Sequence, residues 1–329
     1  MTTHPYRQGI PEEILALSHE RDLLRRKGHY AKADVLKQQL EDAGYAVKDN
    51  PHGAHLVILP SIFVDGIQYR TIHQLPSLLE EPDQCTFSVN ILARNNSDEA
   101  RRCIESVLQF AGTTSVEVML IDNSSQDGFD IWAEALHHRD KRVHVLRSTR
   151  KMGIAEAYNI GLLQSHGHYI LLLDTTVELT GDIFTPLAHS LSDPVVGLTG
   201  PRGLITDNMR HFEETDELEV EVIDARCMAF RRTSLKKAGL LDEGYRYSEF
   251  MDVDFSFAIR DNDEHTLRTP DLALTYHPET QPTGLSSAEQ TRLTKRNFYR
   301  YLSKWGDRED LLLEGYSTDE DDDDDDEDV

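Results

Sequence analysis

The feature that most constrains the fold is a short, unbroken run of apolar residues that ends at an acid. Residues 169–173 read YILLL, and Asp174, Thr175 and Thr176 follow them. The run is too short to cross a membrane and lacks the alternation of a half-exposed strand, so it predicts a central parallel strand covered on both faces. Ligands of open α/β sheets bind just beyond the carboxyl ends of such strands. Asp174 is therefore a candidate for binding a metal, a phosphate-bearing ligand or a sugar hydroxyl; the alternative is that it only caps the following turn.

The net charge narrows the classes of partner. The 329 residues carry a formal charge of −25, and residues 319–328 are ten acids in succession. Without that segment the charge is still about −15. This balance argues against binding to DNA, against general RNA binding and against docking on anionic lipid. We expect residues 307–329 to be a disordered, acidic, solvating tail.

Cysteine spacing and the apolar runs indicate a cellular setting. Cys85, Cys103 and Cys227 are widely spaced and form no CxxC pair, so neither a disulfide framework nor a zinc site is expected. The N-terminus lacks the apolar core of a signal peptide, and no apolar run reaches ~18 residues. The sequence therefore predicts a cytoplasmic protein.

Composition and periodicity divide the chain into four segments. Residues 1–76 predict two short helices, at 11–28 and 29–43, followed by a β-hairpin that turns at Asp65-Gly66. Residues 77–84 read as a linker, and residues 307–329 form the tail. The segment between them, 85–306, alternates strands with helices, which predicts an α/β fold with a mostly parallel, doubly wound sheet and helices on both faces. The expected strands lie at 85–95, 116–122, 143–148 and 169–173.

Polar or loop-forming residues follow the strands of this expected sheet. They are Ala93 with Asn95, then Asp122, then the loop from Lys151 to Gly153, and finally Asp174. The carboxyl ends of parallel strands meet at one edge, so we expect these residues to converge there. The sequence has neither GxGxxG nor GxxxxGK[ST], so neither a dinucleotide site nor a P-loop is indicated.

Residues 86–305 resemble the family 2 glycosyltransferases of the GT-A (Rossmann-like) fold, in particular their rhamnosyltransferase-like branch. The matching segments, in the family's order, include SVNILARNNSDEARRCIESVL, VMLIDNSSQDG, KMGIAEAYNIGL, LLLDTTVEL and MDVDFSFAIRDN. The resemblance implies transfer of a sugar from a nucleoside-diphosphate sugar to an acceptor hydroxyl, in glycan or cell-surface polysaccharide synthesis. The residues it implies for binding the nucleotide sugar are Ala93, Asn95, Asp122, Lys151, Gly153, Asn159 and Asp174.

The same resemblance implies a catalytic base and an acceptor side. Asp252 lies where the family's E-D-x-D motif has its general base, which implies an inverting reaction, although Met251 replaces the preceding acid. Asp242 and Glu243 lie in the acceptor-side segment KAGLLDEGY. For Asp252 the alternative is a helix-capping or salt-bridge acid, and for the other pair it is a simple turn.

A divalent cation, Mn²⁺ or Mg²⁺, is implied with Asp174 and His277 as ligands. Thr176 replaces the last carboxylate of the family's DxD motif, and a hydroxyl is a weaker ligand for a hard cation. Lys151 replaces an Asn of the family, and a lysine there would neutralise a diphosphate directly; the alternative is a solvent-facing lysine. These departures leave open a catalytically impaired, glycosyltransferase-like binding or scaffold protein.

Two further segments suggest partners. Residues 20–53 resemble the helical hairpin near the C-terminus of bacterial cysteinyl-tRNA synthetases, on the AKAD stretch from Ala31 to Asp34 among other features. The resemblance implies RNA or partner recognition; the alternative is packing or homo-oligomerisation, which the acidic chain favours. The last expected helix, 286–306, is basic and aromatic, and such a helix can lie on the inner membrane surface near a lipid-linked acceptor.

Overall fold

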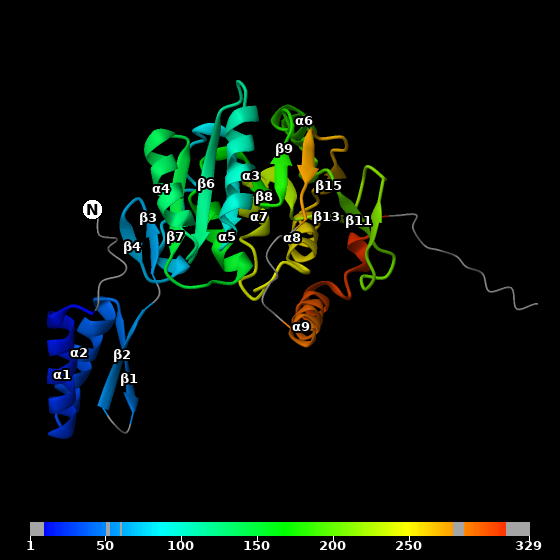
Figure 1. Cartoon of the computed structure of the whole chain (residues 1–329). Coiled ribbons are helices and arrows are strands. Elements are labelled where there is room, and N and C mark those ends of the chain that lie inside the picture. The colour runs from blue at the N-terminus through cyan, green and yellow to red at the C-terminus, as the bar shows by residue number, and fades with distance from the viewer. Residues whose placement is uncertain (1–9, 51–52, 60, 279–285, 314–329) are drawn as a thin grey trace, which may run out of the picture. The chain divides into compact units, whose positions relative to one another are not determined.

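A computed structural model describes residues 10–50, 53–59, 61–278 and 286–313 (Figure 1). The chain divides into two compact units, residues 1–74 and 75–329. Most of the predicted acidic tail lies outside the described residues.

The first unit contains a helical hairpin and two antiparallel strand pairs. The helices are α1 (Glu12–Arg26) and α2 (Tyr30–Asp42); Gly28 and Gly44, after their ends, have φ values of 76° and 97°. The predicted turn is confirmed, since Asp65 and Gly66 join β3 (Ile62–Val64) to β4 (Ile67–Tyr69) with positive φ. The second pair, β1 (Tyr45–Asn50) with β2 (Gly53–Ile58), was not predicted. A short 3₁₀ helix, Ile72–Gln74, follows.

The second unit is built around a mixed, mostly parallel sheet, as predicted. Its strand order is β15-β10-β14-β8-β5-β6-β7. Strands β7, β6, β5 and β8 are parallel, whereas β14 is antiparallel to both of its neighbours. The strands are β5 (Cys85–Ala93), β6 (Val116–Asn123), β7 (Val143–Ser148), β8 (Gly167–Leu173), β10 (Val196–Gly200), β14 (Cys227–Arg231) and β15 (His265–Arg268).

Helices cover both faces of this sheet (Figure 1). Side chains alternate along β5, so Val89 and Ile91 join one apolar cluster with α3 (Ser97–Phe110), α4 (Phe129–Arg139) and α6 (Phe184–Leu191), while Asn90 faces α5 (Ile154–Leu163). The remaining helices are α7 (Arg232–Ala238), α8 (Met251–Arg260) and α9 (Ser287–Trp305), with a 3₁₀ turn at Glu309–Leu311.

Two small sheets complete the unit. β9 (Val177–Leu179) pairs with β16 (Leu274–Tyr276), and β11 (Gly203–Ile205) lies between β12 (Glu213–Thr215) and β13 (Val222–Ile223). Because Tyr276 is opposite Val177, the β9–β16 pair brings His277 beside the segment that follows Asp174.

Helix α9 corrects one expectation. Its aromatic face does not remain free for a membrane surface: Tyr301 is fully buried, and Leu302 and Trp305 pack against the cluster that includes Phe257 of α8. Tyr299 alone among its aromatic residues is largely exposed, at 58%. None of the helices in the described residues is both long and apolar enough to span a membrane.

Candidate active site

Asp122 lies at the carboxyl end of β6, opposite Ala93 of β5. Its side chain is fully buried, and Oδ1 accepts a hydrogen bond from the Ser125 N–H at 2.8 Å. Oδ2 accepts no hydrogen bond from the described residues and lies 3.4 Å from Arg147 Nε. Burial raises the pKa of Asp122 despite that guanidinium. The end of β6 therefore holds a buried carboxylate oxygen with unused capacity to accept a hydrogen bond from the described residues, beside the Arg147 guanidinium.

The loops around Asp122 are joined by side-chain amides. Asn95, in the left-handed region at φ 52°, accepts a hydrogen bond from the Gln126 N–H at 2.7 Å. The Asn123 amide accepts from the Met152 N–H and donates to its carbonyl oxygen, at 2.8 and 3.2 Å. The loops after β5, β6 and β7 are thereby connected, as the sequence predicts for residues at one sheet edge.

Lys151 and Gly153 lie in the loop that leads into α5. The Lys151 ammonium lies 5.8 Å from the centroid of the Tyr247 ring, and partial burial together with Arg94 lowers its pKa. A Cβ on Gly153 would lie 3.2 Å from Arg246 Cα, so glycine permits a close backbone approach here. The lysine is exposed and therefore available to an anionic ligand.

Asp174 directly follows β8, and hydrogen bonds from Thr176, in the same loop, orient its side chain. Oδ1 accepts hydrogen bonds from the backbone N–H of Thr176, at 2.9 Å, and from the Thr176 hydroxyl. The Asp174 N–H donates to the Arg226 carbonyl oxygen at 2.9 Å. Thr176, which stands where the family has a second carboxylate, thus orients the first.

Asp252 is the second residue of α8, which begins after Phe250. Its Oδ1 accepts from the Val253 N–H at 3.0 Å, and Oδ2 accepts from the Ala225 N–H at 3.4 Å. Burial, reinforced by the charge of Asp224, raises the pKa of Asp252 to about 6. A carboxylate with this pKa is ionised at neutral pH and is a stronger base than an ordinary aspartate.

The segment from Asp224 to Arg226 was not predicted from the sequence. Arg226 Nε binds both carboxylate oxygens of Asp224, at 3.0 and 3.1 Å, and its guanidinium lies 4.8 Å from the centroid of the Tyr276 ring. The Arg226 carbonyl oxygen accepts a hydrogen bond from the Asp174 N–H, and the Ala225 N–H donates one to the Asp252 carboxylate. This segment therefore joins two predicted site residues and adds a cation, and its only sequence signal is an Asp-x-Arg before a buried strand.

The hydrogen-bond partners of His277 are Thr176 and Glu178 rather than Asp174. Its backbone N–H donates to the Thr176 carbonyl oxygen at 2.8 Å, while the ring Nε2 lies 2.7 Å from Glu178 Oε2. Within the described ranges, no group of three or more His, Cys, Asp or Glu side chains is placed to hold a metal ion. A cation at Asp174 would therefore depend on oxygens supplied by the ligand.

Three other predicted residues have structural partners. Asn159 is 1% exposed, and its amide donates to and accepts from the backbone of Leu241, at 2.7 and 3.0 Å. Burial raises the pKa of Asp242, but the side chains of Arg300 and Lys304 overcome this and hold it well below its ordinary value. Glu243 is half-buried beside it. These contacts position α9 and the 239–245 loop, and they do not support direct substrate contacts by Asn159 or Asp242.

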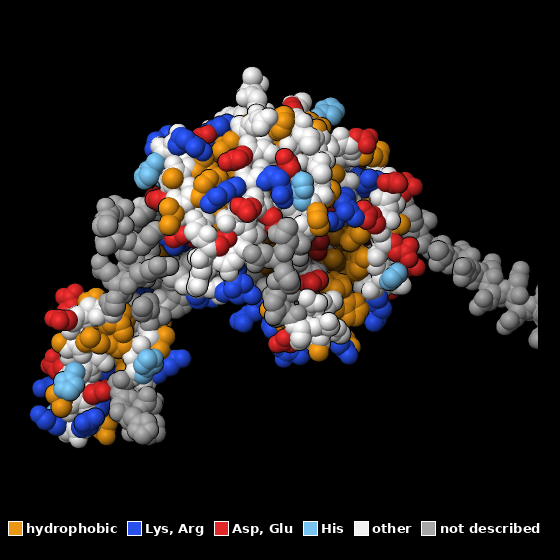
Figure 2. Space-filling model, viewed as in Figure 1, with side chains coloured by type: hydrophobic (Ala, Val, Ile, Leu, Met, Phe, Trp, Pro, Cys, Tyr) orange, Lys and Arg blue, Asp and Glu red, His pale blue; other side chains and the backbone are white. Residues whose placement is uncertain are grey.

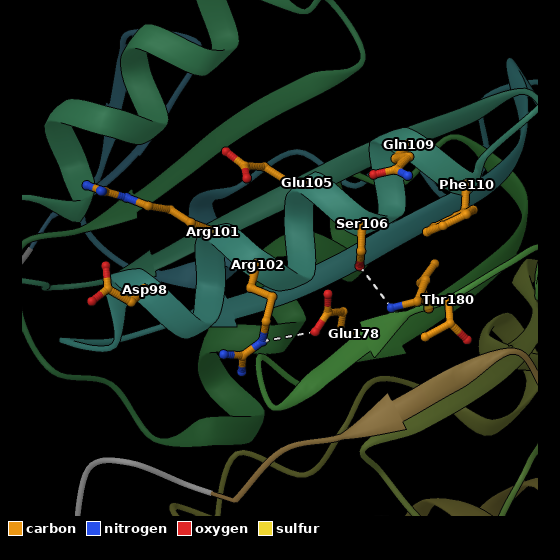
Figure 3. Close-up of a pocket in the computed structure, with 10 residues that line it drawn as sticks. Asp98, Arg101, Arg102, Glu105, Ser106, Gln109, Phe110, Glu178 and Thr180 are labelled. Carbon is orange, nitrogen blue, oxygen red and sulfur yellow. Dashed lines mark hydrogen bonds and ion pairs between the residues drawn. The ribbon is translucent and has the colours of Figure 1, made fainter.

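A cavity of about 570 Å³ lies between α3 and β9 (Figure 3). Arg102 of α3 points toward Glu178, with Nε 3.6 Å from Oε2, and the Ser106 hydroxyl accepts from the Leu179 N–H at 2.9 Å. None of the predicted nucleotide-binding residues lines this cavity.

On the face shown in Figure 2, acidic and basic side chains are interspersed over the second unit.

Solved structures with a similar fold include two glycosyltransferases. GalNAc-T7, solved with UDP, GalNAc and Mn²⁺, aligns with a TM-score of 0.59 and 19% identity over 70% of this chain and 49% of that chain. The mannosyltransferase PcManGT from Pyrobaculum calidifontis, in complex with GDP-Man and Mn²⁺, aligns with a TM-score of 0.50 and 16% identity over 71% and 68% of the two chains. At these identities the likeness establishes the fold.

The sequence comparisons establish the family. Glycosyltransferase GlyG of Streptococcus pneumoniae serotype 4 (strain ATCC BAA-334 / TIGR4) is 31% identical over 89 residues, which is 27% of this chain and 29% of that relative. The chain thus matches less than a third of the length of this curated relative. Residues 88–261, more than half of the chain, match the family model described as Glycosyl transferase family 2. This protein therefore belongs to glycosyl transferase family 2.

Proposed function

We propose that this protein transfers a sugar from a nucleoside-diphosphate donor to an acceptor hydroxyl, with inversion and with Asp252 as the general base. The observation that carries the proposal is the raised pKa of Asp252, about 6, together with its link to Asp174 through residues 224–226: the Ala225 N–H donates to Asp252, and the Arg226 carbonyl oxygen accepts from the Asp174 N–H. General bases work best when their pKa lies near the operating pH. Family membership supports the same reaction class.

The reaction transfers one proton and exchanges one bond at the anomeric carbon. Asp252 accepts the proton of the acceptor hydroxyl as the oxygen attacks the anomeric carbon from the face opposite the diphosphate. The bond from that carbon to the diphosphate oxygen breaks, and the nucleoside diphosphate leaves with the electron pair. The configuration at the carbon is inverted.

The donor would lie along the carboxyl edge of the sheet. Asp122 Oδ2 accepts no hydrogen bond from the described residues, although it lies 3.4 Å from Arg147 Nε, so we assign the nucleobase N–H to it and the diphosphate to the exposed Lys151. Arg226 is a second cation near Asp174, although Asp224 binds it here. In this proposal, base recognition and diphosphate binding belong to different loops.

The donor set fits a divalent cation only in combination with the diphosphate. Mg²⁺-type ions are often bound by one or two carboxylates together with substrate phosphate oxygens, and Asp174 supplies one carboxylate, with His277 nearby through Thr176. A bound cation would neutralise charge on the leaving diphosphate. GalNAc-T7 and PcManGT were both solved with Mn²⁺, which supports testing this ion first.

The alternative of a non-catalytic binding or scaffold protein rests on Thr176 and Met251. Thr176 orients Asp174 in this structure, and Asp252 is retained, so neither replacement removes a group that the proposed reaction needs. The rhamnosyltransferase-like branch, a lipid-linked acceptor and a partner for the N-terminal hairpin remain predictions.

Calorimetric titration with UDP, dTDP and GDP, each with and without Mn²⁺, tests the donor site. We expect one nucleotide to bind, and Asp122→Asn to weaken it or change the preferred base. Binding that needs Mn²⁺ supports the cation at Asp174, whereas binding without it assigns the diphosphate to Lys151 and Arg226. If none of the three binds under either condition, the proposed function is wrong.

A further inference from the structure

A second cavity of about 570 Å³ lies between α9 and the turn that precedes α8. Its volume lies within the roughly 300–1,000 Å³ of small-molecule sites. Its lining includes Phe250, Gln290, Thr291, Thr294 and Phe298. Thr291, Thr294 and Phe298 follow one another at spacings of three and four positions, so they share one face of α9, and Gln290 lies next to Thr291.

The lining chemistry matches a carbohydrate. Two aromatic rings, Phe250 and Phe298, lie 5.4 Å apart between centroids and provide an apolar surface for the C–H face of a sugar ring. The Thr294 hydroxyl provides a donor and an acceptor for sugar hydroxyls, and the Thr291 hydroxyl, which donates to the Ser287 carbonyl oxygen at 2.9 Å, provides an acceptor. A cavity that combines an apolar wall with a few convergent polar groups is the common form of a small-ligand site.

The charge of the lining favours an uncharged ligand. Among the described residues that line it, Glu249 and Lys295 are the charged ones, one of each sign. Phosphate or carboxylate sites gather several cationic donors, which this cavity lacks among the described residues. The chemistry therefore points to a neutral sugar rather than to a phosphorylated one.

The cavity is joined rigidly to Asp252. Phe250 occupies the left-handed region at φ 65°, which is rare for a bulky residue and is held only where surrounding contacts fix it. Its carbonyl oxygen accepts from the Asp254 N–H at 3.0 Å, and Asn297, 2% exposed, donates from Nδ2 to the Glu249 carbonyl oxygen at 2.9 Å. These hydrogen bonds hold residues 249–250 to α8 and against α9. Because Asp252 follows Phe250 by two residues, the face of α9 that lines the cavity is fixed relative to Asp252.

We infer that this cavity, between α9 and residues 249–250, binds the acceptor as a neutral sugar. The inference rests on the proposed function, because an acceptor must reach Asp252 from a site fixed relative to it. It assigns acceptor recognition to α9 rather than to Asp242 and Glu243. Asp242 then acts indirectly, since its ion pairs with Arg300 and Lys304 hold α9 in place.

Saturation-transfer NMR with methyl glycosides of glucose, galactose, mannose and rhamnose tests the inference on the full chain. We expect saturation transfer to at least one glycoside, and at least a fivefold weaker effect in the Thr291→Val/Thr294→Val double variant. Gln290→Ala, at an exposed position, provides a second variant if the first does not fold. Ser303→Ala removes a hydroxyl from the same helix outside the cavity and should match the wild type.

Two results would overturn the inference: no saturation transfer from the wild type to any of the four glycosides, or equal transfer in the wild type and the cavity variants. The nucleotide titration separates this from failure of the proposed function. If a nucleotide binds but the cavity variants retain glycoside binding, only the assignment of the acceptor site fails. If no nucleotide binds, the proposed function itself fails.

Discussion

Replacing Asp252 with Asn should make the protein more stable at alkaline pH while it strongly slows the proposed reaction. Burial and Asp224 raise the pKa of Asp252 from its ordinary value of 3.8 to about 6 in the folded state. A raised carboxyl pKa means that ionisation costs more in the folded than in the unfolded chain. The native state therefore loses stability as pH rises from about 4 through about 6, and this loss is complete above that range.

The magnitude follows from the two pKa values. Their difference of about 2 corresponds to roughly 3 kcal/mol, at 1.36 kcal/mol for each pKa unit. Asn has one oxygen in place of two, so either the Ala225 or the Val253 N–H loses its acceptor, which costs about 1 kcal/mol. The net gain at pH 8 is about 2 kcal/mol, which corresponds to a Tm increase of roughly 4–8 °C for a unit of this size. At pH 4.5 the gain and the cost should nearly cancel.

Differential scanning calorimetry of the full chain at pH 8 and pH 4.5 measures this difference. Asp263→Asn, at an exposed position just beyond the same helix, is the matched control and should show no such pH-dependent gain. If Asp252→Asn has the same Tm offset from the wild type at both pH values, Asp252 does not titrate as a buried, raised-pKa carboxyl, and the reasoning for its role as base is wrong.

Other substitutions test the packing that positions the site. Asn159→Ala removes two buried hydrogen bonds to the Leu241 backbone and leaves both groups unpaired, so we expect the free energy of unfolding to fall by about 2–4 kcal/mol in urea denaturation; an unchanged value would mean that these bonds are not formed. Gly161→Ala would place Cβ 2.0 Å from Asn90 Oδ1 and 2.8 Å from Ile121 Cδ1, and such overpacking should cost about 1–3 kcal/mol or more. A wild-type denaturation midpoint would contradict the close approach of α5 to β5 and β6.

Local sequence patterns were sufficient to predict the parallel strands at the centre of the sheet. The apolar run at 169–173 is the interior strand β8, and its unbroken apolar character reflects helices on both faces. The loops after β5, β6 and β7 meet at one edge, because parallel strands all present their carboxyl ends there. Asp122 and Asp174 could thus be placed at that edge from the order of the strands, whereas Asp252 was predicted only from the resemblance of its segment to a family motif.

Long-range contacts account for what could not be predicted. Arg226 was missed because its role depends on Asp224 and on Tyr276, fifty residues away, and no local pattern shows that pairing. Asn159 was assigned to the nucleotide because its sequence context does not reveal Leu241 as its partner. The aromatic residues of α9 suggested a membrane face because periodicity shows that a face is apolar, without showing what covers it.

Release of nucleoside diphosphate from a panel of UDP-, dTDP- and GDP-sugars, by the wild type and by Asp252→Asn, tests the central claim most directly. Calorimetry on the same samples gives the Kd for the nucleotide. We predict slow release by the wild type with water as acceptor and a rate lower by about 10²–10⁴-fold in the variant. The nucleotide Kd should be unchanged and Asp263→Asn should match the wild type. Equal rates in the wild type and Asp252→Asn would contradict the assignment of Asp252 as the base.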